Sequence, residues 1–203
     1  MNFIKTSFLS GLSTAISLLA RLISTKIVAV YLGTNGMFLM GQLKDFLRLG
    51  NTIGSFGIEN GIVKYVSEYE SEKTKLSDII GTSFKINFAS ALIFSSLILV
   101  FKNQISDFLQ INFSENFYFL ILIFSIISAS IHTCFLSIYN GLNSIKLYVL
   151  VNIFSNIISA IILVILVLEM QIIGAFYALA INQIFSLLIN IMLFFTYKPF
   201  EIG

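Results

Sequence analysis

Residues 147–168 read LYVLVNIFSNIISAIILVILVL, a run without a charged side chain. About 20 mostly apolar residues suffice for a helix to cross the hydrocarbon of a bilayer, so this run has the length and composition of one crossing. Single charged residues, Lys146 and Glu169, separate it from two further uncharged runs, 116–145 and 170–197. The C-terminal part of the chain therefore predicts three consecutive membrane helices.

The composition of the whole chain points the same way. Of its 203 residues, 57% are hydrophobic and 11% are charged, and the mean hydropathy is +0.94. Soluble domains carry about 45–50% apolar and about 25% charged residues. A net charge of +2 is also too small for a nucleic-acid-binding surface. We therefore predict an all-α, polytopic membrane protein with no nucleic-acid partner.

Six transmembrane helices are predicted, which would form one bundle, a single transmembrane domain over residues 1–203. The predicted spans are 8–32, 38–63, 79–101, 117–140, 147–168 and 172–196. Lysines favour the cytoplasmic side of short loops, which predicts that both termini are cytoplasmic. In that orientation one lysine, Lys102, lies outside and seven lie at cytoplasmic ends: Lys5, Lys64, Lys73, Lys75, Lys85, Lys146 and Lys198.

Charged residues inside the first two predicted spans form the candidate functional site. In the second span polar residues recur every three or four positions, which places them on one face of a helix: Gly41, Lys44, Arg48, Asn51, Ser55 and Glu59. The first span has a similar stripe with Ser17, Arg21 and Ser24. Because a short turn joins the two spans, their polar faces are expected to line a shared space. Lys26, five residues past Arg21, would point about 140° away from it.

The candidate cavity residues for substrate binding are Arg21, Lys26, Lys44, Asp45, Arg48, Asn51 and Glu59. Four cations against two carboxylates give this space a charge of +2, or +1 without Lys26. Ionisable groups inside a membrane are costly and usually face a cavity or a partner, so a cationic cavity for an anionic group is favoured. The alternative is that Asp45 and Glu59 neutralise the cations in internal ion pairs.

Milder polar stripes in the later spans are interpreted as helix packing, because small and amide side chains commonly join membrane helices. They include Asn156 with Ser159, Asn182 with Ser186, and Ser83 with Asn87. The segment Gly54-Ser55-Phe56-Gly57 is expected to lie within the second helix, with its glycines as packing or hinge positions.

Catalytic and metal-binding motifs are not found in the sequence. There is one cysteine, Cys134, and one histidine, His132, so a thiolate cluster is excluded and a zinc site is disfavoured. No nucleotide-binding loop and no nucleophile elbow occur. We expect no enzyme activity and no cofactor, and we interpret His132 as a hydrogen-bonded core residue, with a ligand or proton-relay role as the alternative.

Three stretches resemble the Wzx-type flippases of bacteria. They are residues 26–69 (KIVAVYLGTNGMFLMGQLKDFLRLGNTIGSFGIENGIVKYVSEY), residues 139–150 (YNGLNSIKLYVL) and residues 174–180 (GAFYALA). The likeness is strongest to the O-antigen and lipid III (enterobacterial common antigen) branch. These proteins form part of the polysaccharide exporter family within the multidrug/oligosaccharidyl-lipid/polysaccharide superfamily.

This resemblance implies an inner-membrane transporter that flips an undecaprenyl-pyrophosphate-linked oligosaccharide for O-antigen or other surface polysaccharide biosynthesis, including that of lipopolysaccharide. Two six-helix lobes would enclose a cationic cavity and rock to give alternating access. The chain would correspond to the N-terminal lobe, a truncated half that needs a second lobe or a homodimer mate among the membrane lipids. A polysaccharide polymerase would be a further partner. The alternatives are a drug or polymer exporter of the superfamily, and a membrane fragment that does not transport.

Overall fold

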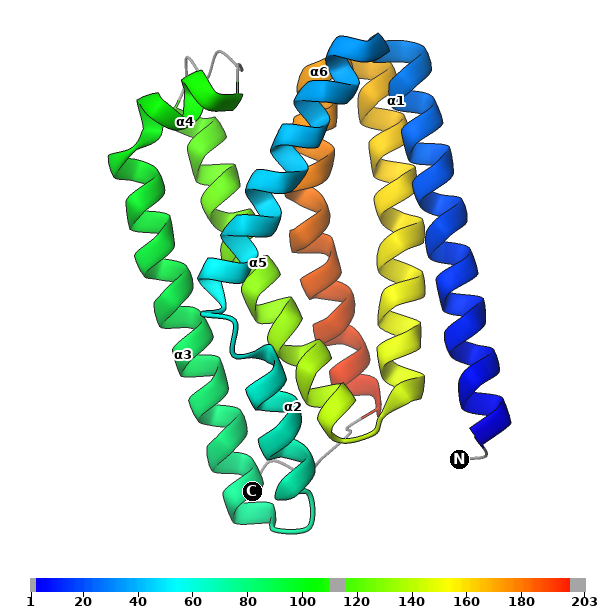
Figure 1. Cartoon of the computed structure of the whole chain (residues 1–203), viewed down its shortest axis with the longest axis vertical. Coiled ribbons are helices and arrows are strands. Elements are labelled where there is room, and N and C mark those ends of the chain that lie inside the picture. The colour runs from blue at the N-terminus through cyan, green and yellow to red at the C-terminus, as the bar shows by residue number, and fades with distance from the viewer. Residues whose placement is uncertain (1–2, 110–115, 198–203) are drawn as a thin grey trace.

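The computed structural model describes residues 3–109 and 116–197, with side chains described from Phe8 onwards and not at Asn116. Every regular element in these ranges is an α-helix, as predicted. The helices are α1 (Phe3–Gly54), α2 (Glu59–Glu68), α3 (Lys73–Val100), α4 (Lys102–Leu109), α5 (Asn116–Gly141) and α6 (Ile145–Tyr197). Figure 1 shows them packed lengthwise as a bundle, with α4 across one end.

The two longest helices each fold back on themselves. With 52 and 53 residues, α1 and α6 would each extend roughly 80 Å if straight, more than twice the thickness of a bilayer's hydrocarbon. Each contains one non-helical residue, Gly33 (φ 64°, ψ −164°) in α1 and Gln171 (φ 51°, ψ −125°) in α6. The chain reverses there (Figure 1), so each helix is a hairpin with a first arm and a second arm.

Among the described residues, four helices are long and apolar enough to cross a membrane, namely α1 from Phe8, α3, α5 from Phe117, and α6. Two of them, α1 and α6, are hairpins. Their arms, together with α3 and α5, overlap the six predicted spans. The beginning of α1 and the end of α6 lie at the same end of the bundle (Figure 1). Six membrane crossings and cytoplasmic termini stay predictions, because helix length and composition alone do not establish either one.

The expectation of an uninterrupted helix through residues 54–57 is wrong. Helix α1 ends at Gly54, and α2 begins at Glu59 after a tight turn in which Phe56 (φ 49°) and Gly57 (φ 64°) have a left-handed backbone. Ile58 N donates to Ser55 O (3.2 Å) instead of to the carbonyl of Gly54. That carbonyl accepts from Ser90 Oγ of α3 and from Ser130 Oγ of α5 (2.9 Å). Hydroxyls of two neighbouring helices therefore replace the missing helical bond.

Two segments that lie between the predicted spans are partly helical. Residues 64–78 contain the end of α2 and the start of α3, and the turn between these helices covers only residues 69–72. Residues 102–115 begin with α4, whose one buried side chain, Leu109, packs into the core with Leu122 and Phe176. Residues 110–115 lie outside the described part of the chain.

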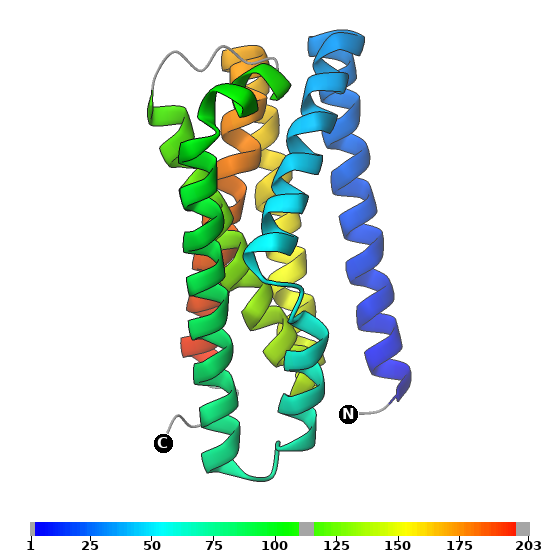
Figure 2. The ribbon, with the colours of Figure 1, turned by 60° about the vertical axis from the view of Figure 1, so that its left-hand side comes forward.

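The hairpins α1 and α6 lie side by side, and their turns pack against one another. Val28 and Met40 of α1 join Leu163, Val167 and Ala175 of α6 in one apolar cluster near the two turns. Figure 2 shows the first arm of α1 at the edge of the bundle. This packing holds four helical arms around the region where the polar stripes were predicted.

Candidate functional site: a cationic cavity between two hairpins

A cavity of about 510 Å³ opens between the arms of α1 and α6. This volume lies in the range of ligand pockets, which is about 300–1,000 Å³. Polar side chains contribute much of its lining. The lining residues are Ala20, Arg21, Ser24, Lys44, Leu47, Arg48, Asn51, Asn156, Ser159, Ala160, Leu163, Leu179, Asn182 and Gln183.

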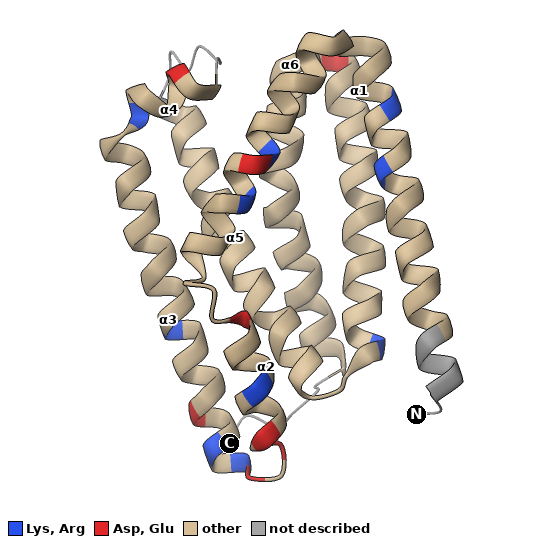
Figure 3. Cartoon of the chain, in the orientation of Figure 1, with Lys and Arg blue, Asp and Glu red and all other residues tan. Residues whose placement is uncertain are grey.

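Three cations from both arms of α1 line the cavity. Arg21 comes from the first arm, and Lys44 and Arg48 come from the second. Lys44 and Arg48 are four residues apart, so they are neighbours on one helix face, and Asn51 continues that face. The turn at Gly33 brings the two arms together. Figure 3 shows Lys and Arg side chains as blue bands on both arms of α1.

Carboxylates do not line this cavity in the described ranges. Its three cations also form no ion pair there; an ion pair elsewhere in the described part of the chain joins Lys75 Nζ and Glu72 Oε2 (2.9 Å) at the α2–α3 turn. Internal neutralisation of the cations, the alternative left open by the sequence, is therefore not seen in this part of the chain. The cavity has a formal charge of +3 from Arg21, Lys44 and Arg48, which favours an anionic group.

Four of the seven predicted site residues, Arg21, Lys44, Arg48 and Asn51, line one cavity, and three do not. Lys26 is exposed, in keeping with its angle from Arg21 on the helix. Asp45 does not line the cavity, because adjacent residues on a helix point about 100° apart and Asp45 is therefore turned away from Lys44. Glu59 lies beyond the helix break and accepts a hydrogen bond from Ser55 Oγ (3.3 Å).

Helix α6 contributes neutral polar groups that sequence reasoning had assigned to helix packing. Asn156 and Ser159 come from its first arm, and Asn182 comes from its second. Gln183, which the sequence analysis did not single out, also lines the cavity from the second arm. Asn182 Oδ1 is buried and has no hydrogen-bond partner among the described residues. The stripes of amides and serines were visible in the sequence, but the sequence did not show which neighbour each stripe faces.

Two hydrogen bonds between helices fix the amides at the cavity wall. Asn51 Nδ2 donates to Thr133 Oγ1 of α5 (3.1 Å), and Asn156 Nδ2 donates to Ser17 Oγ of α1 (3.0 Å). The first bond ties the second arm of α1 to α5, and the second bond ties its first arm to α6. The cavity is therefore built on packed helices rather than on loops.

The single histidine lies outside this cavity. His132 Nδ1 is 3.1 Å from Asn190 Nδ2, which also donates to the His132 carbonyl (3.3 Å). This arrangement is that of a hydrogen-bonded residue between α5 and α6. Within the described ranges, no group of three or more His, Cys, Asp or Glu side chains could hold a metal ion.

Comparison with known proteins adds a partial relationship. No protein-family model matches the chain, and no solved structure matches it. The lipid III flippases of Escherichia coli (strain K12) and Shigella flexneri are each 32% identical to it over 83 residues. The match covers 41% of this chain and 20% of each relative, so it spans about a fifth of the curated relatives' length.

Because it has several long apolar helices and this match, the chain is a multi-pass membrane protein. Within that class it has a partial, flippase-like relationship over the matched residues.

Proposed function

We propose that this chain takes part in flipping an undecaprenyl-pyrophosphate-linked oligosaccharide across the bacterial inner membrane, for O-antigen or related surface polysaccharides. One observation carries the proposal: three cations without a carboxylate partner in the described structure line one cavity between apolar hairpins. Because charges in a membrane are costly, such a set is expected where an anionic group binds. A pyrophosphate linked to a lipid is an anion that must pass this region.

The cavity side chains suit both parts of such a headgroup. Arg21 and Arg48 can each bind phosphate oxygens through two parallel N–H groups, and Lys44 adds a point charge. The amides of Asn51, Asn182 and Gln183 both donate and accept hydrogen bonds, as sugar hydroxyls require. We assign the cations to the pyrophosphate and the amides to the first sugar.

The proposal includes the topology predicted from the sequence. Six crossings with cytoplasmic termini would make the chain one lobe of a twelve-helix transporter of the polysaccharide exporter family. A second six-helix lobe, from a longer chain or a second copy, would cover the cavity. Rocking of the lobes would then present the cavity to each side in turn.

A matched pair of lysines tests the proposal in the source organism. Lys44→Gln removes a cation that lines the cavity, and Lys26→Gln removes one from the same hairpin that does not. Each change is made in the native gene, and the surface polysaccharide and the lipid-linked precursor on the cytoplasmic face are quantified. We expect Lys44→Gln to reduce the polysaccharide and accumulate precursor, and Lys26→Gln to leave both unchanged.

Equal polysaccharide in the two variants at matched protein levels would contradict the assignment of the cavity. Deletion of the gene separates the alternative classes. Altered drug resistance with normal surface glycan would indicate a drug exporter. Normal glycan and normal resistance would indicate a membrane protein that does not transport.

A further inference from the structure

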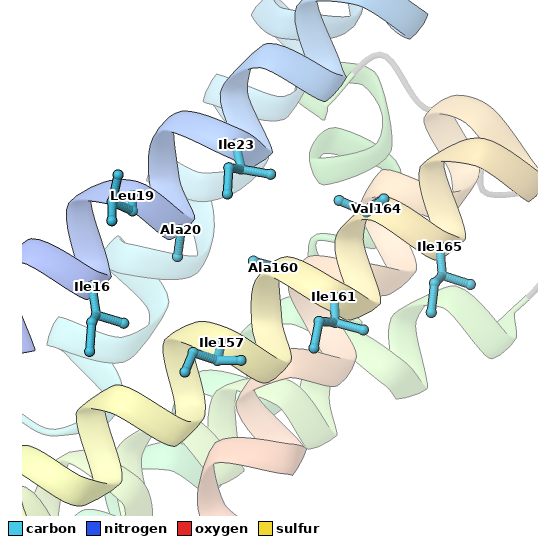
Figure 4. A pocket seen from close by; sticks show the side chains of 9 residues that line it. All are labelled: Ile16, Leu19, Ala20, Ile23, Ile157, Ala160, Ile161, Val164 and Ile165. Carbon is cyan, nitrogen blue, oxygen red and sulfur yellow. The ribbon is translucent and has the colours of Figure 1, made fainter.

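An apolar groove of about 400 Å³ runs between the first arm of α1 and the first arm of α6. Its lining consists entirely of isoleucine, leucine, valine and alanine side chains. Figure 4 shows Ile16, Ala20 and Ile23 of α1 facing the first arm of α6, which carries Ile157 and Ile161. The groove is therefore a hydrocarbon surface bounded by two helices.

The groove and the cationic cavity adjoin where Ala20 of α1 and Ala160 of α6 face one another, a place referred to below as the Ala20–Ala160 crossing (Figure 4). Exactly two of the residues lining the groove, Ala20 and Ala160, also line the cavity. Arg21 follows Ala20 directly, so a cation stands next to the crossing on the cavity side. Two methyl side chains, one from each helix, are therefore the lining groups that the apolar space and the cationic space share.

A hydrogen bond joins the two arms close to the crossing. Asn156 Nδ2 donates to Ser17 Oγ (3.0 Å), one turn from Ala160 on α6 and about one turn from Ala20 on α1. The first arm of α1 lies at the edge of the bundle (Figures 1 and 2). At the crossing, the small side chains of Ala20 and Ala160 therefore lie beside the first arm of α1, which has neighbouring helices on one side only in the described structure.

We propose that the groove holds the hydrocarbon chain of the same lipid whose anionic headgroup occupies the cavity, and that the chain passes between them at the Ala20–Ala160 crossing. This inference rests on the proposed function and adds the site for the lipid part of the substrate. A ligand with a charged head and a long apolar chain matches two adjoining spaces of those same characters. A bilayer acyl chain would match only the groove.

Photo-crosslinking at matched isoleucines tests this directly. Ile161 in the groove and Ile93 on α3 are 53% and 56% exposed, and Ile93 lines neither space. A benzophenone amino acid replaces one or the other in the full chain, which is reconstituted in phosphatidylglycerol–phosphatidylcholine vesicles. Parallel vesicles contain undecaprenyl pyrophosphate, undecaprenol or neither lipid.

We expect undecaprenyl pyrophosphate to be captured several-fold more at position 161 than at position 93. Arg48→Gln should lower capture at position 161 towards the level at position 93, because the headgroup anchors the chain. Undecaprenol, which lacks the charge, should be captured equally at both positions. Equal capture of the pyrophosphate lipid at both positions, or capture at position 161 that Arg48→Gln leaves unchanged, would overturn the inference.

Closing the crossing gives a second, independent readout. Ala20→Leu and Ala160→Leu place larger side chains at the crossing, one from each helix. Ala29→Leu makes the same change at an exposed position of the first arm of α1. The two crossing variants should reduce capture at position 161, and Ala29→Leu should not. If all three variants capture alike, the passage is refuted.

Headgroup binding is measured separately, as retention of undecaprenyl pyrophosphate by the purified protein in native mass spectrometry. Retention that depends on Arg48, without capture at position 161, means that the cavity binds the headgroup and the groove proposal fails alone. Absence of retention means that the proposed function itself fails.

Discussion

The hairpins α1 and α6 have nearly the same length but differ in what they bring to the molecule. Helix α1 has six charged residues, turns at a glycine and ends at a break after Gly54. Helix α6 has two, one near its start and one at its turn, and it remains helical to Tyr197. Every cation of the cavity comes from α1, whereas α6 supplies amides and a hydroxyl.

This difference shows how two similar hairpins can divide the work of one site. Cations provide strong but poorly directional attraction, while amides provide directed hydrogen bonds. All the charged residues of the cavity are on α1, so the arms of α6 contribute to the cavity without placing a charged side chain in it. The variants below test this division, starting with the largest expected effect.

Charge reversal on α1 should weaken lipid binding far more than amide loss on α6. Hydrogen bonds to charged groups contribute about 1.5–3 kcal/mol, and neutral ones about 0.5–1.5 kcal/mol. Arg48→Glu should therefore weaken binding of undecaprenyl pyrophosphate by more than about tenfold, and Asn182→Ala by only a few-fold. Binding is measured on the purified protein by native mass spectrometry. An Asn182→Ala loss equal to that of Arg48→Glu would break the comparison.

Removing the hydroxyls at the α1 break should destabilise the fold. Ser130 Oγ and Ser90 Oγ both donate to the Gly54 carbonyl, so Ser130→Ala leaves it with a single donor and adding Ser90→Ala leaves it with none of these hydroxyls. A buried polar group without a partner costs about 1–3 kcal/mol, which is the loss expected for the double variant. Equilibrium unfolding in mixed detergent micelles measures it.

A third serine provides the control for this measurement. Ser96 lies on the same helix as Ser90, is exposed, and donates only to Leu92 O of its own helix (2.9 Å). Ser96→Ala should change the free energy of unfolding by less than about 0.5 kcal/mol. An equal loss from Ser96→Ala and from the double variant would mean that the break needs no external donors.

The two turns should respond in opposite directions to exchange of their residues. A Cβ at Gly33 would contact nothing within 4 Å, so the cost of Gly33→Ala is the strain of a backbone conformation (φ 64°, ψ −164°) that is essentially restricted to glycine, about 1–3 kcal/mol. Gln171 already bears that strain at φ 51°, so Gln171→Gly relieves it. The greater entropy of the unfolded glycine offsets about 0.5–1 kcal/mol of the gain. We expect a small net stabilisation in the same unfolding assay, and destabilisation by both changes would contradict it.

The helices and part of the site could be predicted from the sequence because both depend on short-range periodicity. Long uncharged runs marked the arms of α6, and spacing by three or four residues placed Lys44, Arg48 and Asn51 on one face. The same helical angle predicted that Lys26 points away from Arg21. These inferences require only residues within a few turns of one another.

The remaining features depend on contacts between distant parts of the chain. Asn156 and Asn182 line the cavity because the two hairpins pack together, and a stripe of amides looks the same whether it faces a helix or a cavity. The break at Ser55–Ile58 escaped prediction because residues from α3 and α5 satisfy the freed carbonyl. Ion pairing of Asp45 and Glu59 with the cations was left open as an alternative, because a count of charges carries no information about the direction in which each side chain points.

The hydrogen bond between Ser17 and Asn156 has a consequence for biosynthesis. Its partners are 139 residues apart in the chain. At about 5–20 residues per second, the ribosome completes Asn156 about 7–28 s after Ser17. The α1 hairpin therefore emerges with its cations long before the amides that face them exist. The hairpin α6 can dock against α1 only after α6 has been synthesised, and until it docks the cavity does not exist.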